Sequence, residues 1–197
     1  MLPPPGYAKT STPITAPLLE RRFFRLYTVG QSALGFGYAD SRFSDPRSPP
    51  RFGVAYFGER IETCFVERII RDKRNGLDGP LLISQRELDR LMCVEIEVAS
   101  DVVAIDLVGR NIVRNGIDTD VVGASDQALA RQWSVAFHAH RFNLAGVLYD
   151  SRLIGEPCLA VYDRALHGLK PLQDKPLLQW PRHLAHILRT YNVAIAP

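Results

Sequence analysis

A glutamate and a tyrosine in the stretch FGVAYFGERIETCFVE, residues 52–67, have types and a spacing that could serve to break a glycosidic bond. The stretch reads as a short strand running into a helix, with Tyr56 near the end of the strand and Glu67 in the helix. A carboxylate lowers the barrier to breaking a glycosidic bond when positive charge develops on the sugar ring. Glu67 also lies four residues before Arg71 and outside the centre of the apolar arc, as in a solvent-facing ion pair. The helical pattern alone leaves both interpretations open.

A second chemical candidate is Arg25, which interrupts the aromatic strand FFRLYTV at residues 23–29. Strand alternation puts Arg25 on the same face as Phe23 and Tyr27. A guanidinium among aromatic side chains needs a carboxylate or a phosphate as its partner. The pattern therefore predicts either an internal salt bridge or an anionic ligand at this position.

Other chemical motifs are weak. GFGYAD, residues 35–40, resembles the start of a dinucleotide fingerprint, but no apolar helix follows it. His183 and His186 are three residues apart without a cysteine or carboxylate beside them, so no metal site is predicted. The cysteines form no CxxC pair and lie in apolar runs, which predicts buried free thiols; they are Cys64, Cys93 and Cys158.

Bulk composition excludes several classes of protein. The chain has 197 residues, enough for one well-packed domain. It is 46% hydrophobic with a net charge of +3, well short of the basic stripe of a direct nucleic-acid binder. No apolar stretch reaches the length of a membrane span, and the start lacks a signal-peptide core. We expect no membrane partner and a cytoplasmic location.

The elements that position the candidate residues mix strands and helices without a regular βαβ rhythm, which predicts an α+β fold. The expected strands are residues 23–29, 53–57, 92–99 paired with 102–107, 145–151 and 158–163. The expected helices are residues 60–73, 126–142, 181–191 and a short one capped by Ser84 and Glu87. A long loop spans residues 30–51.

The two ends of the chain differ in character. Residues 1–17 hold five prolines and are predicted to be a flexible arm, with the folded domain spanning residues 18–197. The last helix carries an apolar stripe that fits self-association into a homo-oligomer and packing on the domain's own core equally well. The stripe consists of Leu184, Ile187, Leu188 and Tyr191.

Three blocks of sequence resemble the RES domain family. They are FFRLY, the longer stretch SRFSDPRSPPRFGVAYFGERIETCFVE and, toward the end, AGVLYDSR; the likeness runs from about Leu19 to Asp163. On this resemblance the Arg, Glu and Ser that give the family its name are Arg25, Glu67 and Ser151. Arg42 takes the place of a second arginine, although Phe43-Ser44 replaces the Trp-Asn that usually follows it.

The resemblance implies a fold like that of ADP-ribosyltransferases, with small, mostly antiparallel sheets forming a cleft and helices around it. It implies a toxin of a bacterial toxin–antitoxin pair, inhibited by an antitoxin that occupies the cleft. The implied activity is consumption of NAD+ by phosphorolysis or hydrolysis of the nicotinamide–ribose bond. NAD+ is the implied substrate, phosphate is the co-substrate if the reaction is phosphorolysis, and no metal or prosthetic group is implied. Transfer of ADP-ribose to a protein is the alternative activity, and a non-enzymatic partner-binding module is the alternative function.

The implied roles suit the residue types. Glu67 would face the developing positive charge, and Arg25 and Arg42 would bind the pyrophosphate. Tyr56 or Tyr27 would stack on nicotinamide. Ser151 would position nicotinamide or ribose by hydrogen bonds, with no covalent role, because no activating partner is visible in the sequence.

Overall fold

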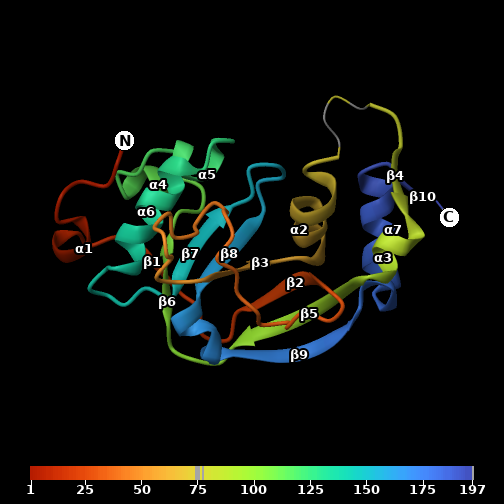
Figure 1. Ribbon diagram of the computed structural model, residues 1–197, viewed down its shortest axis with the longest axis horizontal. Helices are drawn as coiled ribbons and strands as arrows, with labels where there is room; N and C mark the ends of the chain where they lie inside the picture. The colour runs from red at the N-terminus through yellow and green to blue at the C-terminus, as the bar shows by residue number, and fades with distance from the viewer. Residues whose placement is uncertain (74–75, 77, 197) are drawn as a thin grey trace.

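The fold is built on one large β-sheet that curves beneath the helices (Figure 1). The structure is a computed structural model and describes residues 1–73, 76 and 78–196. In this part of the chain the sheet has eight strands, in the order β1-β6-β7-β8-β3-β2-β5-β9, and β10 and β4 form a separate pair. The strands are β1 Thr15–Pro17, β2 Arg22–Thr28, β3 Val54–Gly58, β4 Leu81–Ser84, β5 Leu91–Val98, β6 Val103–Asp106, β7 Gly146–Asp150, β8 Pro157–Tyr162, β9 Leu169–Pro176 and β10 Val193–Ala196.

Short helices cover both ends of this sheet (Figure 1). They are α1 Tyr7–Thr10, α2 Ile61–Phe65, α3 Gln85–Asp89, α4 Asn111–Arg114, α5 Asp120–Gly123, α6 Ala128–His138 and α7 Pro181–Thr190. The π-helical turn η1, Val66–Ile70, continues α2, and two 3₁₀ turns span Asp163–Gly168 and Leu177–Gln179. The predicted α+β class is confirmed, and so is the cap of α3, where the Ser84 hydroxyl accepts the Glu87 N–H at 3.2 Å.

The large sheet is mostly antiparallel, as predicted, but it is a single sheet and not a set of small ones. Its parallel pair is β6 with β7. Strands β1-β6-β7-β8-β3 and strands β2-β5-β9 form two halves, which meet through the pairing of Phe24 with Gly58. This narrow junction makes one curved surface out of what would otherwise be two sheets.

The predicted pairing of residues 92–99 with residues 102–107 is wrong. β5 lies between β2 and β9, whereas β6 lies across the molecule between β1 and β7. Alternation in a strand determines which side chains face the core, but the partner strand depends on packing between distant segments. The two glutamates of β5 are partnered from β2: Arg22 Nη1 lies 3.6 Å from Glu95 Oε1, and Arg22 Nε lies 3.6 Å from Glu97 Oε2.

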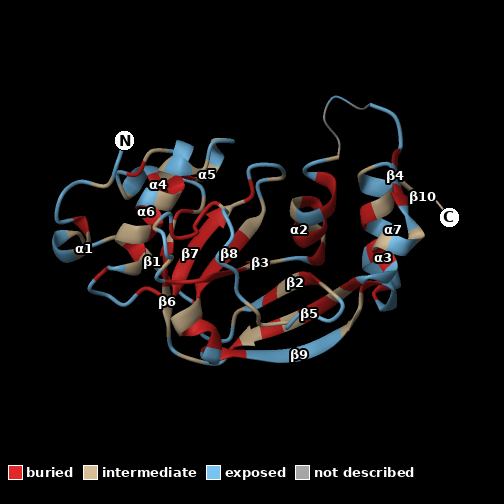
Figure 2. Cartoon of the chain, viewed as in Figure 1, coloured by how far each residue is buried: buried red, intermediate tan, exposed pale blue. Residues whose placement is uncertain are grey.

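Apolar clusters on both faces of the sheet hold the helices in place, and Figure 2 shows the buried sides of the strands beneath them. α6 buries Trp133 and Phe137 against β7 and β8. α7 buries Leu184 and Ile187 in the cluster that includes residues of α2 and β5, and Leu188 and Tyr191 pack, partly buried, against the same cluster. No helix in the described part of the chain is long and apolar enough to cross a membrane.

The first seventeen residues, predicted to be a flexible arm, pack against the domain. Tyr7 of α1 is buried, with its ring centroid 5.0 Å from that of Trp133, and β1 pairs with β6 at the edge of the sheet. Proline limits regular structure in this segment, but Tyr7 and Ala16 each bury an apolar side chain. In the structure these residues therefore contact the domain that is predicted to begin at residue 18.

Candidate active site

A cleft of about 480 Å³ opens between the helix formed by α2 and η1 and the loop that precedes β3. Strands β2, β3, β7 and β8 contribute most of its remaining lining, together with Gln127 before α6 and Arg152 after β7. Five arginines and three carboxylates line it among the described residues: Arg25, Arg42, Arg68, Arg71, Arg152, Asp40, Glu67 and Asp72. This excess of arginine makes the cleft electropositive and suited to an anionic ligand.

Glu67 lies on the π-helical turn η1. The Arg71 N–H donates to the Val66 carbonyl at 2.9 Å, the five-residue spacing of a π-helix, and such turns are frequent at functional sites. Glu67 Oε2 is 3.6 Å from Arg71 Nη1, so the ion pair suggested by the sequence is present. Glu67 also lines the cleft. Glu67 therefore forms the ion pair expected of a surface helix and also lines the cleft, as expected of a catalytic carboxylate.

Ser151 holds the other oxygen of this carboxylate. It follows β7 in the turn to β8 and is 2% exposed. Its hydroxyl donates to Glu67 Oε1 at 2.5 Å and accepts the Leu153 N–H at 3.2 Å. The structure therefore brings Glu67 and Ser151, 84 residues apart in the sequence, into direct contact. Because Ser151 is buried behind Glu67, it positions the carboxylate and has little surface for a ligand.

Arg25 lies in the cleft without a carboxylate partner among the described residues. Its Nη1 donates to the carbonyls of Ala33, at 3.0 Å, and of Gly35. Its guanidinium carbon lies 5.7 Å from the centre of the Phe57 ring. Burial, reinforced by nearby Arg68, lowers the pKa of Arg25 from its usual value. The internal salt bridge considered from the sequence is therefore not what holds this arginine.

Arg42 and Tyr56 line the opposite wall. Arg42 is buried and donates to the carbonyls of Val121 and Ala124, at 3.3 and 3.0 Å, at the end of α5. The Tyr56 hydroxyl donates to Ser41 Oγ at 3.0 Å and accepts the Phe43 N–H at 2.8 Å. These bonds fix the loop that carries Arg42 onto β3.

Tyr27 is not in the cleft. It is buried, and its hydroxyl donates to Asp174 of β9 at 2.5 Å. Strand alternation places Tyr27 on the same face of β2 as Arg25, as the sequence predicted. Arg25 lines the cleft, whereas Tyr27 lies farther along the strand and contacts Asp174 of β9. The predicted contact between Tyr27 and nicotinamide is therefore not supported by the geometry.

Sequence reasoning missed several residues of the cleft. Arg68 and Arg152 directly follow Glu67 and Ser151, so adjacency to the candidates was a usable signal. Tyr149 of β7 also lines the cleft, and the sequence around it indicated a strand but no role in a site. The thiols of Cys64 and Cys158 also line it, but burial raises the pKa of both, that of Cys64 to about 12, so neither is a ready nucleophile.

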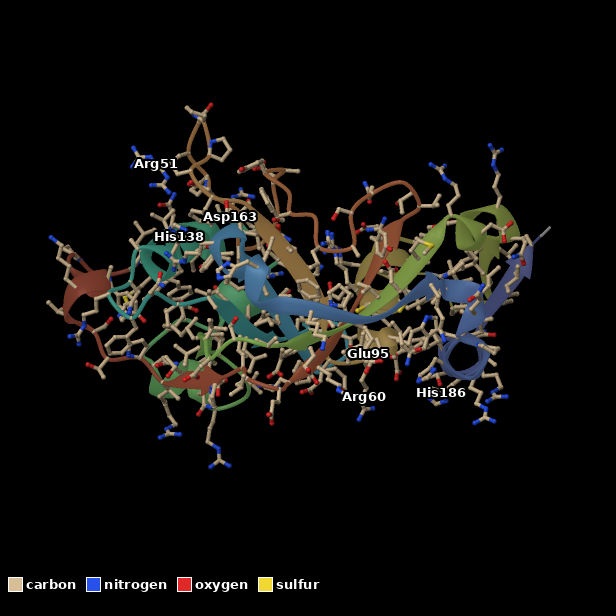
Figure 3. All side chains as sticks on the ribbon, turned by 90° about the horizontal axis from the view of Figure 1, so that it is seen from below. Arg51, Arg60, Glu95, His138, Asp163 and His186 are labelled. Atoms are coloured by element: carbon tan, nitrogen blue, oxygen red, sulfur yellow. The ribbon has the colours of Figure 1, made fainter. Side chains whose placement is uncertain are left out.

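The histidines form no metal site in the described part of the chain. No group of three or more His, Cys, Asp or Glu side chains there could hold a metal ion. His138 on α6 and His186 on α7 lie far apart, on opposite sides of the view in Figure 3. His138 stacks on Phe52 with ring centroids 4.2 Å apart.

The fold and the cleft define an α+β protein in which a glutamate, fixed by a serine, faces an arginine-lined cavity. Residues 21–181 match the family described as "RES domain". This match spans most of the chain, which therefore belongs to the RES domain family.

Two known proteins are similar to this chain. The "Probable toxin y4kH" of Sinorhizobium fredii (strain NBRC 101917 / NGR234) is 33% identical over 126 residues, which are 64% of this chain and 99% of that protein. A chain of the "Crystal structure of the M.tuberculosis MbcT-MbcA toxin-antitoxin complex" matches with a TM-score of 0.61. The match covers 86% of this chain and 92% of that one at 20% identity, so this likeness shows the fold alone.

Proposed function

We propose that this protein is the toxin of a bacterial toxin–antitoxin pair and that it cleaves the nicotinamide–ribose bond of NAD+. The observation that carries the proposal is the placement of Glu67, fixed by Ser151 and Arg71, on an arginine-lined cleft. Membership of the RES domain family and the name of the relative from Sinorhizobium fredii support the toxin role.

Glu67 would stabilise the transition state. As the bond between ribose C1′ and the nicotinamide nitrogen breaks, its electron pair neutralises the positive charge on nicotinamide, and the ribose gains oxocarbenium character. A fixed carboxylate facing this ribose is most favourable when the charge is greatest. An oxygen of phosphate or water then bonds to C1′, and the attacking group loses its proton where it carries one. Since Ser151 and Arg71 each hold one oxygen of Glu67, the carboxylate needs little reorganisation.

The arginines would bind the pyrophosphate. Arg25 uses only Nη1 in its hydrogen bonds within the described residues, so its Nη2 and Nε remain available for a phosphate oxygen. Arg42 uses both terminal nitrogens on carbonyls and would act mainly by its charge. A volume of about 480 Å³ lies within the range of small-molecule sites. Tyr56, whose hydroxyl is fixed by hydrogen bonds, would offer its ring to nicotinamide.

The cognate antitoxin would be a protein that covers this positive cleft and so keeps NAD+ out. Electrostatic complementarity favours an acidic segment as the covering part. The toxin would act in the cytoplasm, where its substrate is present. No metal ion or prosthetic group has a role in this scheme.

Nicotinamide release from NAD+ by the purified chain tests the proposal, with and without phosphate and with Glu67→Gln as the matched variant. We expect release by the wild type and a loss of about 100-fold or more in the variant, typical of losing one preorganised charged group. Release that requires phosphate identifies a phosphorylase, and release without it identifies a hydrolase. Label from NAD+ on a protein band would identify ADP-ribosyl transfer instead. No release under any of these conditions would refute the enzymatic proposal.

A further inference from the structure

A second cavity lies next to the candidate active site, on the other side of η1. Its volume is about 540 Å³, similar to that of the cleft. Its lining includes three arginines, Thr28 and two buried apolar residues, Ile69 and Leu91, which we call its floor. We call this cavity the arginine hollow; its main lining residues are Thr28, Arg68, Ile69, Arg86, Arg90 and Leu91.

The positive charge of the arginine hollow is not neutralised within the described residues. Its carboxylate, Glu87, is already paired with Lys73, whose Nζ lies 2.5 Å from Glu87 Oε2. Arg68 donates to Thr28 Oγ1 at 2.7 Å, a neutral partner that leaves its charge in place. Arg86 and Arg90 are exposed, and neither side chain has a hydrogen bond or ion pair within the described part of the chain. Three guanidinium groups therefore line the same cavity, and they have N–H donors that are not used in hydrogen bonds within the described residues.

We propose that the arginine hollow binds the phosphoryl group of a small phosphorylated molecule. Arginine forks match the geometry of phosphate oxygens, and a phosphoryl dianion needs several such donors. A cavity of this size exceeds what a bare phosphate fills, and the floor of Ile69 and Leu91 offers an apolar surface to the remainder of the molecule. Guanidinium planes also stack on aromatic bases, which suits a nucleotide.

Arg68 connects the arginine hollow with the cleft, because it lines both. It directly follows Glu67, and its contact with Thr28 fixes it between the two cavities. A ligand in the hollow would draw on the charge of Arg68 and reduce what that arginine offers to an anion in the cleft. This coupling rests on the proposed function, whereas binding to the hollow does not.

Calorimetric titration with inorganic phosphate and with AMP, at low ionic strength, tests the site. We expect Arg86→Ala/Arg90→Ala to weaken binding about 100-fold, at about tenfold for each lost charged hydrogen bond. Arg182→Ala/Arg189→Ala, which removes the same charge from the exposed side of α7, should leave binding unchanged. AMP binding at least tenfold tighter than phosphate would assign the floor to a nucleoside, and equal affinities would assign the hollow to free phosphate.

Several outcomes would overturn the proposal. Equal weakening by both double variants would mean unspecific attraction of anions. Loss of binding in Arg25→Ala, with binding kept in Arg86→Ala/Arg90→Ala, would locate the anion in the cleft. Binding of poly-glutamate but of neither small probe would assign the arginine hollow to a protein partner. Nicotinamide release, measured on the same variants under the conditions in which the wild type is active, keeps failure of this inference separate from failure of the proposed function, since Arg86 and Arg90 lie outside the cleft.

Discussion

Replacing Ser151 by alanine removes one hydroxyl from behind the candidate catalytic carboxylate. That hydroxyl donates to Glu67 Oε1 at 2.5 Å and accepts the Leu153 N–H at 3.2 Å. Without it Glu67 keeps only its ion pair with Arg71, at 3.6 Å and between side chains that are 26% and 38% exposed. Exposed pairs of this kind hold a side chain weakly. Glu67 should therefore sample several orientations in the variant.

The size of the effect follows from the lost contact. A hydrogen bond to a charged group contributes about 1.5–3 kcal/mol, and each 1.4 kcal/mol changes a rate about tenfold. We expect nicotinamide release by Ser151→Ala to fall about 10- to 100-fold. Because the contact orients a group that acts in the transition state, kcat should fall while KM stays nearly constant.

Steady-state kinetics and thermal unfolding of Ser151→Ala and Ser84→Ala separate this role from a structural one. Ser84 also accepts a backbone N–H at 3.2 Å, from Glu87, but it is not among the residues that line the cleft. Ser151→Ala should lose about 1.5–3 kcal/mol of stability and Ser84→Ala about 1 kcal/mol, and only Ser151→Ala should lose kcat. An unchanged kcat in Ser151→Ala, or equal losses in both variants, would refute the positioning role.

Further predictions concern the shape of the cleft, the pH dependence of stability and the first segment. A Cβ at Gly37 would meet no atom within 4 Å, and Gly37 lines the cleft, so Gly37→Leu should fold with an unchanged Tm but raise the KM for NAD+ about tenfold by filling the cavity. Burial lowers the pKa of His138 from 6.5 to about 4, so the folded protein favours the neutral imidazole. The resulting stability is complete above pH 6.5 and is lost as the pH falls toward 4, by at most about 3 kcal/mol; chemical denaturation should show this slope, and His138→Phe should lack it. Tyr7→Ala should cost about 2 kcal/mol and expose Trp133, and an unchanged tryptophan emission spectrum would contradict the packing of this segment.

Much of the local structure could be predicted from neighbouring residues. The aromatic run at residues 23–29, the strand before Glu67 and the cap formed by Ser84 are all present, because propensity and capping act over a few residues. Strand pairing could not be predicted in this way. The partner of β5 depends on which distant strand packs beside it, and alternation is the same for any partner.

The candidate site divides in the same way. The sequence determined which glutamate, arginine and serine match the three name-giving residues of the family, and that Glu67 could pair with Arg71 at a distance of one helical turn. Tertiary packing brings the Ser151 hydroxyl to Glu67 and the Tyr27 hydroxyl to Asp174, and it adds further arginines to the lining of the cleft. These contacts join segments far apart in the chain, and their formation depends on how the two halves of the sheet meet. The local sequence pattern determines on which face of its strand or helix a side chain lies. The packing of segments far apart in the chain determines which residues that side chain contacts.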